Sequence, residues 1–247
     1  MSETKDTVDV LAFGAHPDDV ELSAGGTLLR AREAGLTVAV CHLTKGEAGT
    51  RGDPQTRAQE AAQAGAVLGV RHVDQLDLGD GGLHDDDKSR MAVADAIRRR
   101  RPRTVLAPHL DDLHPDHAAT GSIVKAAAFL SGVRKWNPGQ SAWRPDATFY
   151  YMMHTPFEPD IVVDITSVFE SRRQAVECYA SQFHNPNSTE PHTFISDESF
   201  WHWWEGRAAY FGHFIGVRYG EPLRFDGPLP TSNPFSLFSG FGKYKNT

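Results

Sequence analysis

Short apolar runs alternate with helical patterns along the first half of this 247-residue chain, and this alternation limits the possible fold more than any other feature. The predicted strands are Asp9–Ala15, Thr37–Leu43, His72–Leu78 and Thr104–Pro108. The predicted helices lie at about Gly26–Ala34, Thr56–Leu68, Ser89–Arg100 and Asp116–Leu130. Repeated strand and helix units favour a mainly parallel sheet with right-handed crossovers and helices on both faces. We therefore expect a Rossmann-like α/β fold.

The second half of the chain is less regular. Thr148–Met152 and Ile161–Asp164 are predicted strands. A capping-box pattern from Ser167 to Glu170 predicts a helix that ends near Tyr179. Because no linker-like segment interrupts the chain, we expect a single domain over residues 1–247.

Two C-terminal segments have unusual compositions. Ser199–Phe214 holds too many aromatic residues for one narrow helical stripe. Large exposed apolar patches usually mark association, so core packing with a subunit interface is favoured over a substrate-stacking platform. We accordingly expect a homo-oligomer. The tail, Asp226–Thr247, is rich in Pro, Ser and Gly and is expected to be extended.

Composition excludes several classes of protein. The net charge of −7 provides no general attraction to nucleic acid or to anionic lipid. Cys41 and Cys178 lie far apart and lack zinc-finger spacing, so free thiols in a reducing compartment are expected. The N-terminus is polar, and no apolar run is long enough to span a bilayer. We expect a cytoplasmic protein with no nucleic-acid or membrane partner.

Two polar clusters follow predicted strands. "GAHPDDVE", residues 14–21, comes where the first strand ends, and "HLDDLHPDH", residues 109–117, follows the Thr104–Pro108 strand. The carboxyl ends of parallel strands meet at one edge of a sheet, where ligands bind. The candidate site residues from the two clusters are His16, Asp18, Asp19, His114, Asp116 and His117.

The residue types in these clusters suit a catalytic metal. Two histidines and one carboxylate, with open positions for water, suit Zn²⁺ and also Fe²⁺. Asp18 and Asp19 are adjacent, so their side chains diverge and one can bind the metal while the other faces its water. Each motif taken singly is more often a helix start, but the pair at two strand ends of one sheet is a stronger signal. Gly14-Ala-His-Pro lacks Gly-x-Gly-x-x-Gly spacing, which disfavours a dinucleotide.

These motifs, together with "KGEAGTRG", "TRAQEA" and "YYMMHTPFEPD" in the same order, resemble the zinc-dependent N-acetylglucosaminide deacetylases of the PIG-L/LmbE-like family, most closely the bacillithiol-pathway branch. The resemblance covers about Val8 to Tyr219. It implies that His16, Asp19 and His117 bind the metal and that Asp18 is the general base. It further implies that His114 stabilises the oxyanion or protonates the leaving amine, and that Asp116 orients His114.

The resemblance also suggests a substrate, N-acetylglucosaminyl malate. Arg57 and Asp80 match positions that contact the sugar, and Arg144 matches an arginine near the active site. Arg51 lies on a glycine-rich loop and, with the other two arginines, could bind a carboxylate. Leu113 departs from the family pattern, because related bacillithiol enzymes often carry a basic residue immediately before His-Pro-Asp-His.

Other functions stay open. One is deacetylation of another N-acetylglucosamine-containing molecule, such as a chito-oligosaccharide. A metallophosphoesterase-like hydrolase, suggested by Leu78–Asp85, would need a second cluster of bridging ligands. A non-catalytic sugar-binding protein would not need Asp18 beside the metal ligands. His154 follows a predicted strand and could face the same pocket.

Overall fold

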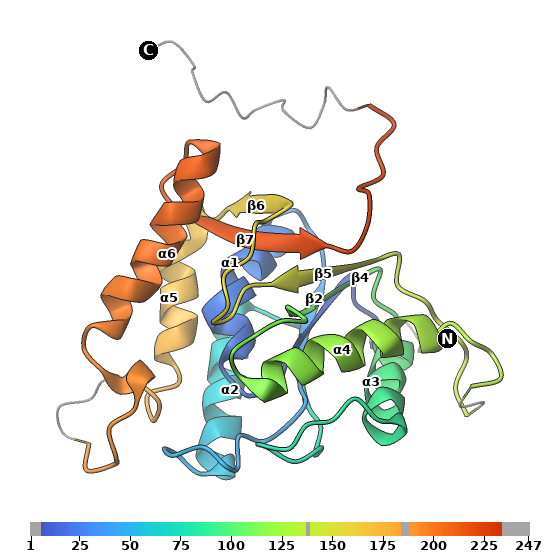
Figure 1. The fold of residues 1–247 in the computed structure, drawn as a ribbon, viewed down its shortest axis with the longest axis horizontal. Helices are drawn as coiled ribbons and strands as arrows, with labels where there is room; N and C mark the ends of the chain where they lie inside the picture. The colour runs from blue at the N-terminus through green and yellow to red at the C-terminus, as the bar shows by residue number, and fades with distance from the viewer. Residues whose placement is uncertain (1–5, 137–138, 184–187, 234–247) are drawn as a thin grey trace.

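The computed structural model describes residues 6–136, 139–183 and 188–233. Within them, one seven-stranded sheet has the strand order β3-β2-β1-β4-β5-β7-β6 (Figure 1). The strands are β1 (Val10–Gly14), β2 (Val38–His42), β3 (His72–Gln75), β4 (Thr104–Pro108), β5 (Ala147–Tyr151), β6 (Ile161–Asp164) and β7 (Gly220–Phe225). Strands β1 to β5 pair in parallel, whereas β7 is antiparallel to both of its neighbours.

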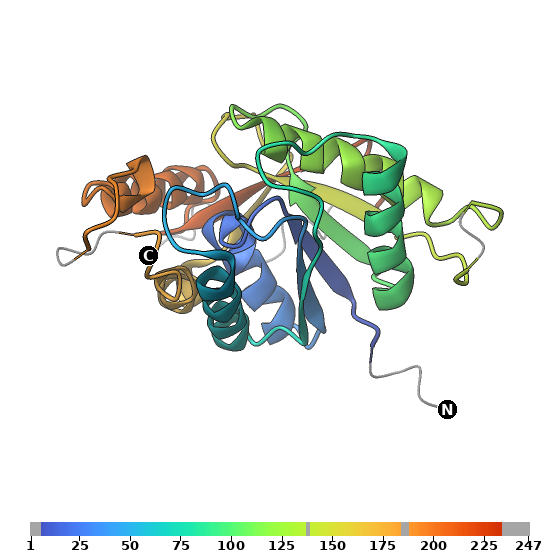
Figure 2. The same cartoon turned by 90° about the horizontal axis from the view of Figure 1, so that it is seen from below.

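Helices cover both faces of the sheet. They are α1 (Asp19–Glu33), α2 (Pro54–Leu68), α3 (Asp87–Arg100), α4 (Pro115–Leu130), α5 (Phe169–Glu177) and α6 (Phe200–Ile215), with 3₁₀ turns at Thr166–Val168 and Phe194–Ser196. Apolar residues of α3 and α4 form one core cluster, and those of α1, α2, α5 and α6 form the other. Figure 2 shows the green α3 and α4 on the opposite side of the sheet from the blue α1 and the teal α2. The expected α/β fold is confirmed.

The central strand β1 is apolar throughout because both of its faces are buried. In β1, Val10 and Ala12 pack into the cluster under α1 and α2, whereas Leu11 and Phe13 pack into the cluster under α3 and α4. This continuous burial explains why the strand reads as an uninterrupted apolar run. Because β1 and β4 are parallel neighbours, the loops after them leave the same edge of the sheet.

Helix α1 begins at Asp19, seven residues before the predicted start at Gly26. Every residue from Asp19 to Gly26 is buried, so the segment shows no amphipathic period by which a helix could be recognised. Gly26 does not mark a helix start. A Cβ atom there would lie 2.7 Å from Cγ2 of Ile165 and 2.8 Å from Oε1 of Glu221, so glycine allows close packing.

Three C-terminal features differ from expectation or were missed. Ser167 lies in a 3₁₀ turn, and α5 begins at Phe169 without a side-chain cap, so the predicted capping box is absent. Strand β7 was not predicted, because Glu221 and Pro222 interrupt any strand-like pattern. Residues 226–233 of the expected extended tail form neither helix nor strand, and 234–247 lie outside the described residues. In the described part of the chain, no helix combines the length and apolar character needed to cross a membrane.

Candidate active site

The loops that follow β1 and β4 bring the two polar clusters together. The ring centroid of His16 lies 5.0 Å from that of His114 and 5.4 Å from that of His117. His16 belongs to the loop after β1, whereas the other two histidines stand at the start of α4. The parallel sheet therefore joins residues about a hundred positions apart in the chain into one centre.

His16, Asp19 and His117 surround a common point. Oδ1 of Asp19 lies 3.2 Å from Nε2 of His117, and Oδ2 of Asp19 lies 3.6 Å from Nδ1 of His16. The three side chains can each offer one ligand atom, with these atoms within 4.8 Å of one another. Oδ2 of Asp19 also accepts a hydrogen bond from the backbone N–H of His16, which holds the carboxylate in place.

Three further carboxylates orient the two ligand histidines. Nε2 of His16 lies 2.9 Å from Oδ1 of Asp80 and 3.4 Å from Oδ2 of Asp116. Nδ1 of His117 lies 2.9 Å from Oδ1 of Asp112. In metal sites the second nitrogen of a ligand histidine commonly donates to a carboxylate, which sets the tautomer and the ring orientation. This pattern leaves Nδ1 of His16 and Nε2 of His117 for a metal.

Sequence reasoning missed Asp112. Its Oδ2 atom accepts hydrogen bonds from the backbone N–H groups of His154 and Thr155, at 2.7 and 3.0 Å. Asp112 thus ties the loop after β5 to His117 while it orients the imidazole. The paired aspartates Asp111 and Asp112, directly after β4, were the available signal.

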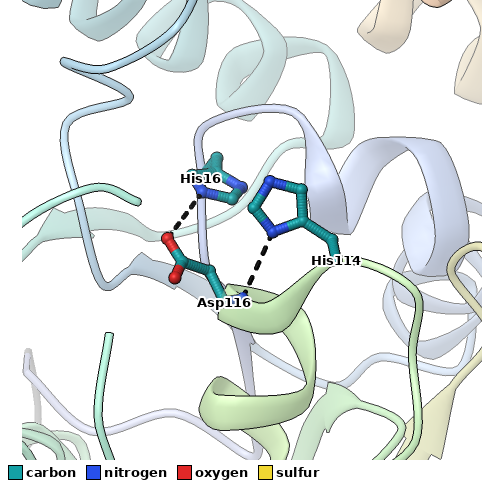
Figure 3. A group of neighbouring side chains, drawn as sticks. All are labelled: His16, His114 and Asp116. Atoms are coloured by element: carbon teal, nitrogen blue, oxygen red, sulfur yellow. Dashed lines mark hydrogen bonds and ion pairs between the residues drawn. The ribbon is translucent and has the colours of Figure 1, made fainter. Parts of the chain in front are cut away.

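His114 and Asp116 interact through a backbone group (Figure 3). His114 is the N-cap of α4, and its Nδ1 accepts a hydrogen bond from the backbone N–H of Asp116 at 3.2 Å. The Asp116 side chain makes no described hydrogen bond to His114, so an orienting role of this carboxylate toward His114 stays a prediction. The Asp116 carboxylate instead faces His16 and accepts from the N–H groups of Gly81 and Leu83, at 2.7 and 3.1 Å. With Nδ1 as acceptor, a neutral His114 carries its proton on Nε2.

Asp18 has a different partner from Asp19. Its backbone φ of 107° lies in the left-handed region, where Asp and Asn are enriched among non-glycine residues. Oδ2 of Asp18 lies 3.0 Å from Nη2 of Arg57, which also donates to the carbonyl of Pro17. Burial raises the pKa of Asp18 to about 6, although Arg57 acts in the opposite direction. The two adjacent carboxylates are therefore available for different tasks.

The charge around the histidines suits a divalent cation. Burial disfavours protonation of His117, but Asp19 and Asp112 outweigh it and raise the pKa to about 9. Burial likewise opposes protonation of His16, yet Asp19, Asp116 and Asp80 hold its pKa well above the ordinary value. A cluster that attracts protons this strongly has an excess of negative charge, which a bound cation would neutralise. The donor set of two imidazoles and one carboxylate fits zinc or ferrous iron.

These residues border a cavity of about 390 Å³. Arg57, Asp80, His154 and Arg207 line it. Sequence reasoning did not single out Arg207. Its guanidinium donates to the carbonyls of Met153 and Leu22, at 2.6 and 3.3 Å. The aromatic residues Phe194, Phe200, Trp203 and Trp204 form another part of the wall.

Two predicted substrate contacts lie elsewhere. Arg144 donates to the carbonyl of Phe129 and covers its ring at 4.2 Å. Phe129 lies near the C-terminal end of α4, and His114 caps the N-terminal end of the same helix. A helix of 16 residues is about 24 Å long, so the two ends are far apart. The expectation that Arg144 lies near the active site is therefore wrong. Arg51 is buried and donates to Ser188 and Glu190, at 2.9 and 3.4 Å, and it does not line the cavity.

The fold and the site define an α/β protein with a candidate metal centre at the carboxyl edge of its parallel sheet. The family model for GlcNAc-PI de-N-acetylase, PIG-L, matches residues 11–128. The chain is 30% identical over 239 residues to a diacetylchitobiose deacetylase of Thermococcus kodakarensis, covering 89% of this chain and 84% of the relative. The chain belongs to the PIG-L family of de-N-acetylases.

Other proteins similar to this chain differ in the activity that their names state. The conserved protein TT1542 from Thermus thermophilus has the same fold with a TM-score of 0.82 and 36% identity, over 92% of this chain and 97% of that one. A 4-oxalmesaconate hydratase of Pseudomonas putida is 28% identical over 70% of this chain and 74% of its own length. A probable N-acetyl-α-D-glucosaminyl L-malate deacetylase 2 of Bacillus cereus is 25% identical, over 70% of this chain and 83% of the relative. The bacillithiol branch is thus a distant relative, and the expected closest match is not supported.

Proposed function

We propose that the protein is a metal-dependent amide hydrolase that removes the acetyl group from a small N-acetylglucosaminide. The observation that carries the proposal is one cavity lined by the His16, Asp19 and His117 group, by Asp18 and by His114. Family membership supports deacetylation as the reaction class. Zinc is the proposed metal, and ferrous iron is the alternative that the same ligands suit.

Each step of amide hydrolysis has a residue in this cavity. A divalent cation held by the three ligands would supply Lewis acidity toward water and toward the amide carbonyl. In this proposal Asp18 accepts the proton of the attacking water, which its contact with Arg57 supports by holding the carboxylate in the cavity. In the same proposal the Nε2–H group of His114 donates a hydrogen bond to the carbonyl oxygen or a proton to the departing nitrogen, and the use of Nδ1 as an acceptor supports this role.

The arginines that were expected to bind a carboxylate have other partners, which favours an uncharged aglycone. Arg51 and Arg144 are engaged elsewhere, and Arg57 is paired with Asp18. Leu113 is 81% exposed and contributes no charge. A chito-oligosaccharide such as diacetylchitobiose is therefore our first proposal. N-acetylglucosaminyl malate is the second, because the sequence motifs resemble those of enzymes that act on it.

The experiment measures free amine released from N-acetylglucosamine, diacetylchitobiose and N-acetylglucosaminyl malate by protein loaded with Zn²⁺ or with Fe²⁺. Release from the disaccharide that is lost in the Asp18→Asn variant would support the proposal. Absence of amine from all three substrates with either metal would overturn it. Hydration of 4-oxalmesaconate in that case would assign the chain to the hydratase relatives.

Two other functions are disfavoured. A two-metal phosphoesterase needs a second set of bridging ligands. Among the described residues, each of the three candidate ligand groups includes His16 or His117, so they make one centre. A purely sugar-binding protein has no use for a buried carboxylate held beside the ligands by Arg57. We also propose a homo-oligomer, supported by the exposed aromatic side chains of Tyr210 and Phe214 on α6.

A further inference from the structure

One face of α6 borders the cavity beside the reaction centre. Phe200, Trp203, Trp204 and Arg207 follow the i, i+3, i+4, i+7 spacing of one helix face, and all four line the cavity. Phe200 and Trp204 are buried in the core. Trp203 is 44% exposed, and Phe194 of the neighbouring 3₁₀ turn is 63% exposed. Two aromatic rings thus remain uncovered in a cavity that otherwise carries the catalytic polar groups.

The two exposed rings are held in place. Their centroids lie 5.9 Å apart in an edge-to-face arrangement, and Phe200 lies 6.0 Å from each of them. Arg207 lies 5.0 Å from the centroid of Trp203, and two backbone carbonyls fix its guanidinium. A ring held by its neighbours loses little conformational entropy when a ligand covers it. The side chains of Trp203 and Phe194 are therefore preorganised for contact with a ligand.

We propose that Trp203 and Phe194 form a stacking subsite for a second, uncharged sugar ring linked to the reacting N-acetylglucosamine. A pyranose presents C–H groups on its faces and hydroxyls at its edge, so it can cover an aromatic ring while its polar groups stay solvated. Arg207 directs guanidinium N–H groups to two backbone carbonyls, so its geometry is less suited to a bidentate contact with a carboxylate. The inference rests on the proposed deacetylase function and adds what the enzyme recognises beyond the acetamido sugar.

The test compares kcat/KM for diacetylchitobiose and for N-acetylglucosamine in the wild type, Trp203→Ala and Phe194→Ala. Because a sugar ring that covers an aromatic side chain removes apolar surface from water, each variant should lower the disaccharide value roughly tenfold more than the monosaccharide value. Phe129→Ala is the matched control, because Phe129 is also an exposed aromatic residue, at 59%, and does not line the cavity. It should leave the ratio of the two values unchanged.

A binding measurement separates recognition from turnover. Calorimetric titration of diacetylchitobiose into Asp18→Asn and into Asp18→Asn with Trp203→Ala should show roughly tenfold weaker binding in the double variant. Equal affinities, or equal losses for both substrates in the kinetic test, would overturn the inference. A smaller oligomer in Trp203→Ala, seen by light scattering, would show that the rings form a subunit contact instead. A wild type that deacetylates both substrates equally well would refute the subsite alone, whereas one that deacetylates neither would refute the proposed function.

Discussion

Asp112 accepts a hydrogen bond from Nδ1 of His117 at 2.9 Å, and this contact turns Nε2 of the same ring toward Asp19. The second oxygen of Asp112 is held by two backbone N–H groups of the loop after β5. The orientation of His117 therefore depends on Asp112 in the loop after β4 and on the position of the loop after β5.

Replacement of Asp112 by Asn should weaken metal binding about 10- to 100-fold, the usual cost of losing an outer carboxylate of a ligand histidine. The affinity is measured by competition with a chromogenic chelator. Asp111→Asn is the matched control, because Asp111 is the exposed neighbour and its carboxylate has no described contact to His117. An unchanged affinity in Asp112→Asn would show that Asp112 does not orient a metal ligand.

Replacement of His117 by Ala should remove most of the bound metal, because one of three protein ligands is lost. His16→Ala should behave alike, whereas His84→Ala should retain the metal because His84 is exposed and lies outside the cavity. Elemental analysis of the purified variants gives the occupancy. Full occupancy in both His117→Ala and His16→Ala would rule out the ligand assignment.

Replacement of Asp18 by Asn should keep the fold and the metal but lower turnover by about two to four orders of magnitude, the usual scale of general acid-base catalysis. Asn is the suitable replacement because, like Asp, it tolerates the positive φ of this position. Turnover, metal content and melting temperature are measured together. Near-normal turnover would mean that another group accepts the proton.

Replacement of Glu221 by Ala should destabilise the fold by about 3–5 kcal/mol, the cost of leaving a buried partner charge uncompensated. Glu221 lies 2.8 Å from Nε of Arg172 and accepts hydrogen bonds from the backbone N–H groups of Gly26 and Thr27. It thereby ties β7 to α1. Chemical unfolding gives the free energy, with the exposed Glu170→Ala as control. A loss no larger than that of the control would contradict the structural role of this pair.

His42 should make stability depend on pH. Burial lowers the pKa of this imidazole to about 4, whereas the unfolded chain keeps the ordinary value near 6.5. The unfolded state therefore binds more protons between these values, and the free energy of unfolding falls as pH drops from about 6.5 to 4. His42→Gln should show a shallower decline between about pH 7 and 5 than the wild type, measured in urea with chelator present. His84→Gln is the exposed control, and identical slopes for all three proteins would exclude His42 as a source of the acid sensitivity.

The local apolar pattern was sufficient to locate several strands of the sheet. The strands Thr104–Pro108 and Ile161–Asp164 have the predicted bounds. The position of the two polar clusters also followed from sequence, because parallel strands direct their carboxyl ends to one edge. His16 and His117 could therefore be placed together without knowledge of any side-chain contact.

What the amino-acid sequence determined by itself was the α/β class and the meeting of two strand ends, since both depend on periodicities within short segments. Three features could be seen only in the tertiary structure. They are the hydrogen bond between Asp112 and His117, the contact of Arg144 with Phe129 away from the site, and the strand β7 that contains Pro222. Each of these features depends on which segments, distant in sequence, lie next to each other in the fold. Such contacts bury polar groups that must find partners across the fold, and no local pattern specifies those partners.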